Sequence, residues 1–220
     1  MIKEIKVPKI VKNKKSQAEE IDELMAYIEQ GGSLGMQMEK KLDDLPEKYV
    51  VLLVIGHDKY DLLIANIAKN FTKKGFSGIF VTLNKGGEDL IAMLEKNKVD
   101  CTNLFVIDAV SKKGTAPKPN KNISYVDSPQ DLTELEAQII DFAKKMQPGK
   151  SFLIVDSLST LLVYNAEKTI EKFVHGLGEK MKEFGFKNVF TIRSKTRPEI
   201  MDVLVQFSDR VIRTGPKINP

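Results

Sequence analysis

The sequence predicts an α/β fold, in which a mainly parallel sheet carries helices on both faces. Short apolar segments of strand length alternate along the chain with amphipathic segments of helix length, and short connectors join them. The first strand segment, residues 49–55, is apolar throughout, which is typical of a strand buried on both faces. Ligands of such sheets bind beyond the carboxyl ends of the strands, so functional residues are expected at that edge.

The predicted elements follow one another from residue 49 onward. Strands are expected at residues 49–55, 78–83, 103–108, 151–156, 188–192 and 210–213, where apolar and β-branched residues gather. Helices are expected at residues 60–74, 88–96, 131–145 and 167–184, where apolar residues recur at helical spacing. Residues 111–122 are rich in Lys, Pro and Gly and are predicted to form a surface loop.

The segment before the first strand is predicted to be an appendage of two parts. Residues 1–15 hold six lysines and one glutamate, and we expect a flexible basic tail there. Residues 16–48 are expected to be a helical N-terminal extension, because Ser16 and Glu19 form a capping-box pattern ahead of an apolar stripe at helical spacing. An α/β domain over residues 49–220 then follows.

Composition places the chain among ordinary globular proteins. Of its 220 residues, 42% are hydrophobic and 29% are charged, which excludes wholesale disorder. No apolar run reaches the roughly 18–20 residues of a membrane helix. The first residues lack the apolar segment of a signal peptide, and the single cysteine cannot form an internal disulfide. A cytoplasmic location is therefore expected.

The net charge of +4 is unevenly distributed along the chain. Residues 1–15 carry +5, and the remaining residues hold 28 basic and 29 acidic side chains, which gives −1. All four arginines lie within the last 28 residues. The basic excess is therefore a short tail on a near-neutral body, and the net charge by itself indicates nucleic-acid binding only through that tail.

Residues 56–63 lead from the first strand into a helix, where a phosphate-binding loop would lie. Such a loop needs glycines whose N–H groups wrap the phosphates, a lysine, and a hydroxyl for magnesium. Gly56 occupies the first glycine position, but Asp61, Leu62 and Leu63 occupy those of the second glycine, the lysine and the hydroxyl. Lys59 could supply the missing charge, although it lies three positions early. Two interpretations stay open: a remnant site at Gly56 and Lys59, and a connecting loop in which Asp61 starts the helix.

The strand at residues 151–156 ends in Asp156, which Ser157 follows. An apolar strand that ends in Asp places a ligand for magnesium beside a phosphate loop in nucleotide-binding proteins. Residues 103–108 have the same form, so the pattern alone does not single out Asp156. Either Asp156 and Ser157 belong to a nucleotide or cation site, or Asp156 caps the turn after the strand.

A basic loop follows the strand at residues 188–192, at the same edge of the sheet. Arg193, Lys195 and Arg197 place three cations in five residues, which could hold a phosphate, an acidic partner or a nucleic-acid backbone. No aromatic residue interleaves with them, so a base-stacking surface is not indicated. The alternative is a solvated charged loop.

The remaining reactive residue types do not form a catalytic or metal-binding pattern. His57 and His175 are far apart in sequence, and Ser157 is not in a nucleophile elbow. Cys101 fits a small, half-buried residue better than a nucleophile. We therefore expect no catalytic residues and no metal site.

Together these segments resemble the RecA/KaiC-like ATPases of archaea. The resemblance rests on residues 152–159 and 208–213, with support from residues 105–109 and 127–133, and it extends over residues 49–214. It implies a RecA-like P-loop fold in which residues 152–159 correspond to the Walker B strand. It also implies that residues 208–213 correspond to the strand before a C-terminal hairpin.

This chain departs from that family at each catalytic feature. Its Walker A motif is degenerate from Lys59 to Leu63, and the acidic pair that activates water falls on Asn84 and Lys85. The basic hairpin that reaches a neighbouring subunit's nucleotide would follow Arg213, seven residues before the last residue. An arginine finger alone is worth about 10³–10⁵ in rate, so we expect no ATPase activity.

The first functional hypothesis is therefore a catalytically inactive RecA/KaiC-like domain, a pseudo-ATPase with a regulatory or protein-interaction role in signal transduction. Its expected partner is another protein or an active paralogue, without cofactor or membrane, and it is expected to be a monomer or dimer. One alternative retains a nucleotide or anion, with Mg²⁺-ATP as the reference ligand, at Asp156, Arg193, Lys195 and Arg197. Another is a nucleic-acid-binding relative of recombinases that uses residues 1–15.

Overall fold

The computed structural model describes residues 34–56, 60–111 and 121–214. Contacts between Cα atoms divide the chain into one unit over Met1–Met38 and a second over Glu39–Pro220. Of the first unit the structure describes only the first half of helix α2 (Leu34–Asp43). The helix predicted after residue 16 and the basic tail lie outside the described residues. Within the described parts of the chain, no helix combines the length and apolar character needed to cross a membrane.

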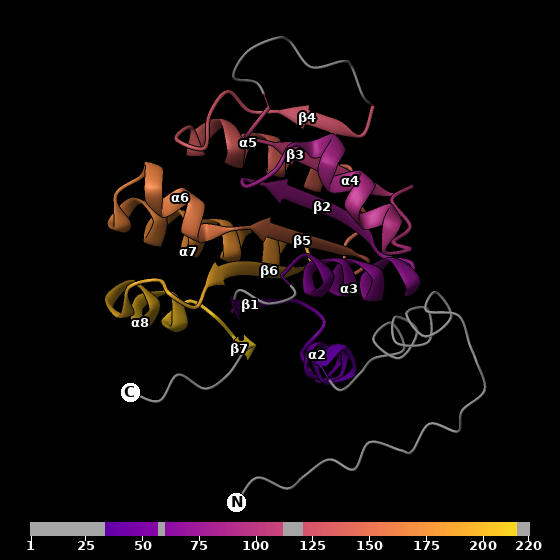
Figure 1. Ribbon diagram of the computed structural model, residues 1–220, viewed down its shortest axis with the longest axis horizontal. Coiled ribbons are helices and arrows are strands. Elements are labelled where there is room, and N and C mark those ends of the chain that lie inside the picture. The colour runs from indigo at the N-terminus through magenta and orange to yellow at the C-terminus, as the bar shows by residue number, and fades with distance from the viewer. Residues whose placement is uncertain (1–33, 57–59, 112–120, 215–220) are drawn as a thin grey trace, which may run out of the picture. The chain divides into compact units, whose positions relative to one another are not determined.

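The second unit is built on a seven-stranded sheet in which every strand pair is parallel (Figure 1). In spatial order the strands are β4, β3, β2, β5, β6, β1 and β7. Their bounds are β1 Tyr49–Ile55, β2 Ser77–Thr82, β3 Leu104–Asp108, β4 Ile123–Tyr125, β5 Ser151–Asp156, β6 Phe186–Arg193 and β7 Arg210–Thr214. The predicted fold class, a mainly parallel sheet with helices on both faces, is confirmed.

Helices cover both faces of the sheet (Figure 1). On one face α3 (Tyr60–Lys73) packs beside α4 (Gly87–Lys96). On the other face α5 (Leu132–Ala143), α6 (Leu158–Tyr164), α7 (Glu167–Glu183) and α8 (Pro198–Gln206) pack in succession. The helices bury an apolar stripe each, because burial of apolar area is the main favourable term in folding.

Burial of strand β1 on both faces explains why its sequence does not alternate between apolar and polar residues. All seven of its residues are buried, and Val50, Leu52 and Val54 belong to the apolar cluster that α5, α7 and α8 complete. The intervening residues point to the opposite face, because side chains alternate along a strand. A strand covered on both sides has no polar face, as the apolar run predicted.

The structure contains three short elements that the sequence did not predict. They are β4, which has three residues, and the helices α6 and α8. None of them is long enough to establish a clear period in the sequence. The start of α8 is determined locally, because Pro198, whose backbone φ suits a helix, occupies the first helical position directly after Arg197. The other predicted elements from residue 49 onward are present, with bounds that differ by a few residues.

The segment at residues 208–213 closes the sheet through Asp209. The backbone N–H of Asp209 donates to the carbonyl of Val50 at 2.8 Å, and its carboxylate accepts from the Val50 N–H at 2.7 Å. These two bonds fix β7 in register beside β1, where Val51 is opposite Arg210. The carboxylate thus replaces a ladder partner at the beginning of the strand.

Candidate functional site

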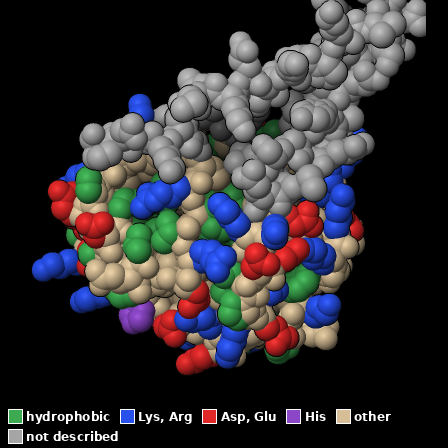
Figure 2. Space-filling view, turned by 90° about the horizontal axis from the view of Figure 1, so that it is seen from below, with side chains coloured by type: hydrophobic (Ala, Val, Ile, Leu, Met, Phe, Trp, Pro, Cys, Tyr) green, Lys and Arg blue, Asp and Glu red, His purple; other side chains and the backbone are tan. Residues whose placement is uncertain are grey.

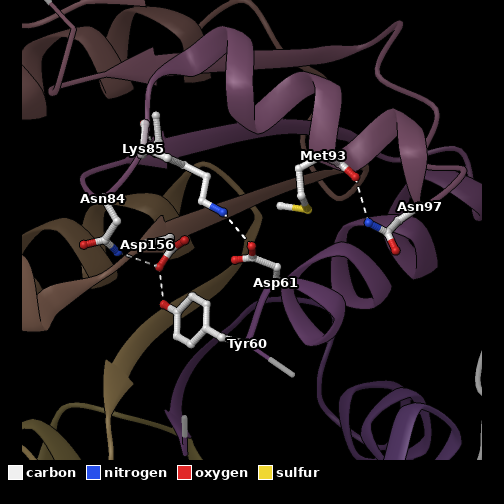
Figure 3. A network of polar contacts seen from close by, with 8 residues as sticks. Tyr60, Asp61, Asn84, Lys85, Met93, Asn97 and Asp156 are labelled. Carbon is white, nitrogen blue, oxygen red and sulfur yellow. Dashed lines mark hydrogen bonds and ion pairs between the residues drawn. The ribbon is translucent and has the colours of Figure 1, made fainter. Parts of the chain in front are cut away.

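The carboxyl edge of the sheet holds a buried polar network centred on Asp156, the last residue of β5 (Figure 3). Asp156 is 2% exposed, although carboxylates are seldom buried without partners. Its neighbours come from three other elements: Tyr60 begins α3, Asn84 follows β2, and Thr191 lies in β6. The sheet order brings these segments together, because β5 lies between β2 and β6.

Three side chains approach the same carboxylate oxygen of Asp156. The Tyr60 hydroxyl donates to Oδ1, and the Asn84 amide donates to it at 3.2 Å. The Thr191 hydroxyl lies 3.2 Å from Oδ1, 3.2 Å from the Val155 carbonyl and 2.9 Å from the Tyr60 hydroxyl. One oxygen of Asp156 is therefore fully engaged by the chain itself.

Burial sets the ionisation behaviour of this network. Desolvation raises the pKa of the Asp156 carboxyl, while the hydrogen bonds from Tyr60 and Thr191 oppose the rise. Burial also raises the pKa of the Tyr60 phenol, and the adjacent charge of Asp156 raises it further. The phenol consequently keeps its proton and serves as the donor to the carboxylate.

Further hydrogen bonds and one ion pair connect the loops around this network. Asn84 also accepts from the Thr160 hydroxyl, so it links the end of β5 to α6. Beside it, the Lys85 ammonium lies 2.8 Å from the carboxylate of Asp61, in the first turn of α3 (Figure 3). The Lys85 carbonyl accepts from the Thr82 hydroxyl at 2.7 Å, which fixes the turn after β2.

Arg193, the last residue of β6, lies over the Tyr60 ring with 4.1 Å between the guanidinium carbon and the ring centroid. Its backbone N–H donates to the Ser159 hydroxyl at 2.8 Å, and that hydroxyl lies 3.2 Å from the hydroxyl of Thr196. A guanidinium stacks well on an aromatic face, since the face of the ring is negative. The side chain and the backbone of Arg193 are both fixed.

The structure brings together only part of the predicted site. Asp156 and Arg193 both contact Tyr60, one at its hydroxyl and the other over its ring. The exposed Arg197 forms an ion pair with Glu167, and Lys195 is exposed. The predicted residue Gly56 donates its N–H to the Thr214 carbonyl at 3.0 Å. Ser157 is buried at the start of α6, and its side chain makes no capping bond to that helix. Lys59 lies outside the described residues.

The alternative roles predicted for Asp156 and Asp61 have different outcomes. The Asp156 carboxylate is hydrogen-bonded to Tyr60, Asn84 and Thr191, so capping of the next turn does not describe its contacts. Asp61 lies in the first turn of α3, as expected for a residue at a helix start. Its neighbour Tyr60 was missed as a site residue, because a tyrosine at a helix start has no phosphate-binding pattern.

Asp108, which ends β3, shows what an ordinary strand-terminal aspartate does in this fold. Its carboxylate accepts from the backbone N–H of Gly87 at 2.7 Å, at the start of α4, and from Val110 and Ser111. Among the described residues, the hydrogen bonds to its carboxylate come from backbone N–H groups. Asp156 differs because its partners are side chains from three other elements.

Two other residues from the sequence analysis lie away from this edge. The ring of His175, on α7, stacks on that of Phe207 with 4.6 Å between centroids. Cys101 is half-buried, as expected, and burial raises the pKa of its thiol to about 11. A thiol with that pKa is a poor nucleophile at neutral pH.

Comparisons with known proteins add a fold and a family model. Residues 73–214 match the model of a family of unknown function (DUF7504). No curated protein matches the chain. Among solved structures, the chain is similar to the crystal structure of a KaiC-like protein from the hyperthermophilic archaeon Pyrococcus horikoshii, with 18% identity and a TM-score of 0.55. The match covers 80% of this chain and 76% of that protein, and at this identity it shows a shared RecA-like fold.

Proposed function

Because the chain belongs to a family of unknown function (DUF7504), we propose its role from its own site: a RecA/KaiC-like domain that does not hydrolyse ATP and acts as a regulatory or protein-interaction module. One observation carries this proposal, which is that the chain's own side chains occupy the carboxyl edge of the sheet. Asp156, to which the sequence resemblance assigns the position of the Walker B aspartate, already accepts from Tyr60 and Asn84.

The start of α3 gives further support. A phosphate bound there would use the positive end of the helix dipole. Here Asp61 places a carboxylate in that first turn, and Lys85 neutralises it at 2.8 Å. In the RecA/KaiC-like ATPases that this sequence resembles, the acidic pair that activates water would fall on Asn84 and Lys85. This chain therefore has an amide and a cation where those enzymes carry acids, and a carboxylate, Asp61, where they bind phosphate. The substitution removes both a site for phosphate and a base for water.

The test is a nucleotide assay on the full chain. We expect no release of phosphate from Mg²⁺-ATP, and no change in Tm at millimolar nucleotide. A ligand present at 100 times its Kd would stabilise the folded state by about 2.7 kcal/mol, which a thermal melt detects easily. Turnover or a Tm rise of several degrees would refute the proposal.

A second candidate function, binding of a nucleotide or another anion at the same edge, is favoured by Arg193. Its guanidinium is fixed over Tyr60 and has no ion pair among the described residues. In that case Asp156→Ala and Arg193→Gln should each weaken binding of Mg²⁺-ATP at least tenfold. Arg197→Gln is the matched control, because Arg197 is already paired with Glu167. Binding that survives both site variants would exclude this candidate.

A further inference from the structure

The cations at the carboxyl edge differ in whether the chain neutralises them. Lys85 is paired with Asp61, and Arg197 is paired with Glu167. Arg193 and Lys195 form no ion pair with any carboxylate of the described residues, and of these two it is Arg193 that lies over an aromatic ring, that of Tyr60. The charge of Asp156 acts on Arg193 at longer range. We propose that Arg193 binds a carboxylate side chain of a partner protein, an inference that rests on the proposed protein-interaction function.

The geometry prepares Arg193 for this contact. The guanidinium lies over the ring of Tyr60. The hydroxyl of that tyrosine donates to Asp156 and lies 2.9 Å from the hydroxyl of Thr191, so the ring itself is held in place. The backbone of Arg193 is fixed by the Ser159 hydroxyl at 2.8 Å. Stacking on one face leaves the N–H groups along the rim of the guanidinium for an acceptor. A side chain that is already ordered loses little entropy when it binds.

The charges nearby favour a single carboxylate over a phosphate dianion. Asp61 is paired with Lys85, and the charge of Asp156 acts on Arg193 without forming an ion pair with it. A dianion would bring two negative charges to one guanidinium near the carboxylate of Asp156, in a partly buried setting where charges interact strongly. A carboxylate carries one charge and matches the guanidinium with two parallel hydrogen bonds.

An exposed apolar surface at the same edge favours a polypeptide over a small carboxylate. Val163 is 77% exposed and Tyr164 is 40% exposed, both at the end of α6. Figure 1 shows α6 beside the carboxyl ends of β5 and β6, and α6 also contributes Ser159, the partner of the Arg193 backbone. A peptide with an acidic residue and an adjacent apolar one could contact Arg193 and Val163 together.

Selection from a randomised peptide library displayed on phage tests the inference. The library is selected on the full chain, after removal of peptides that bind the Arg193→Gln variant. Enriched peptides are then synthesised and their Kd values measured by calorimetry. We expect a shared Asp or Glu, whose change to Asn or Gln weakens binding to the wild-type chain at least tenfold. The same change in the peptide should alter its Kd for the Arg193→Gln chain less than twofold. The acid has then already lost its partner, as expected if the acid and Arg193 contact each other directly.

Four further measurements test whether the interaction is specific. Arg197→Gln should retain wild-type affinity for the peptide, and circular dichroism should show that Arg193→Gln is folded. Val163→Ala should weaken peptides with an apolar neighbour to the acid. Competition with inorganic phosphate and with acetate, each at the same concentration, separates the two anion classes, and we expect acetate to compete at least as well.

Several outcomes overturn the inference. These are no enriched peptide, enriched peptides without a shared acid, equal binding by Arg193→Gln, or displacement by phosphate and not by acetate. The proposed function fails separately, through turnover or binding of Mg²⁺-ATP by the wild-type chain. If the wild-type chain neither binds nor hydrolyses ATP and binds peptides independently of Arg193, the proposed function stands and only the inference about Arg193 is overturned.

Discussion

Two buried tyrosines of this molecule have hydroxyl groups in opposite circumstances. Tyr60 is 7% exposed and donates to Asp156, whereas Tyr49 is 0% exposed and its hydroxyl has no hydrogen-bond partner among the described residues. Removing a donor from a buried carboxylate costs about 1–3 kcal/mol. We therefore expect Tyr60→Phe to lower the free energy of unfolding by that amount, and Tyr49→Phe to leave it unchanged or raise it. Urea titrations of both variants provide the measurement.

The loss in Tyr60→Phe should also depend on pH. The raised pKa of Asp156 means that the folded state holds a proton more tightly than the unfolded state, so this group's contribution to stability falls as pH rises above the usual Asp value. Without the Tyr60 donor the rise in pKa is larger. The difference between variant and wild type should therefore grow from pH 3 to pH 7. A constant difference would show that Tyr60 does not act through Asp156.

The thiol of Cys101 gives a second prediction for a single residue. Burial, with the charges of Glu95 and Asp100, raises its pKa from 9.0 to about 11. At pH 8 this lowers the thiolate fraction about 100-fold, and the thiolate is the reactive form. Iodoacetamide should therefore alkylate the native chain about 100 times more slowly than the chain in urea, with a native rate that still rises between pH 9 and pH 11. Equal rates at pH 8 would contradict the prediction.

At the scale of the elements, helix α7 carries two glycines in contrasting surroundings. A Cβ added at Gly176 would meet no atom within 4 Å, whereas one added at Gly178 would lie 3.0 Å from Val50 Cγ2 in β1. Alanine is favoured over glycine in an exposed helix by about 0.5–1 kcal/mol. We expect Gly176→Ala to raise the free energy of unfolding by that amount.

Gly178→Ala is the matched comparison on the same helix. Its methyl group must displace Val50, and overpacking of a core costs about 1–3 kcal/mol. In thermal or urea unfolding, we expect the free energy of unfolding of Gly178→Ala to be lower than that of Gly176→Ala by about this overpacking cost. Equal stability of the two variants would mean that α7 shifts away from β1 without cost.

The long elements were predictable because each presents a repeating apolar pattern. β1 is apolar in every position, and α7 buries residues at helical spacing from Ile170 to Met181, which is about three turns of helix. β4 and α6 are too short for such a pattern, and the sheet and neighbouring helices stabilise them instead. α8 was missed because Pro198 reads as a break in the sequence and acts as a helix start in the structure.

The candidate site was predictable in its location and only partly in its members. The fold class placed Asp156 and Arg193 at one edge, since parallel strands end together. Tyr60 and Thr191 were missed, because their importance depends on hydrogen bonds between segments that lie 35 to 131 residues apart in sequence. A threonine within the apolar strand β6 was the available signal for Thr191.

For the molecule as a whole, the separation of charge predicts how it would meet a nucleic acid. The body is near-neutral, and Figure 2 shows basic and acidic side chains interspersed over the described part of one face. Residues 1–15 carry +5 and lie outside the described residues. Any nucleic-acid binding should therefore weaken steeply with salt and disappear when residues 1–15 are deleted. Electrophoretic mobility shifts of single- and double-stranded DNA from 50 to 200 mM salt provide the measurement.

A variant with the six tail lysines changed to glutamine is the control for chain length. It should lose binding as the deletion does, because the interaction depends on charge. Binding that survives both changes would assign the contact to the body, where the basic loop at residues 193–197 is the next candidate.

The position of β1 within the sheet has a consequence for biosynthesis. Its two neighbours, β6 and β7, are the last strands of the sheet to be synthesised, and their bonds to β1 join residues about 140–160 positions apart. While the ribosome makes the intervening residues, both edges of a wholly apolar strand lack their partners. Such a segment is prone to aggregate, so the nascent chain should need a chaperone until residue 214 has emerged.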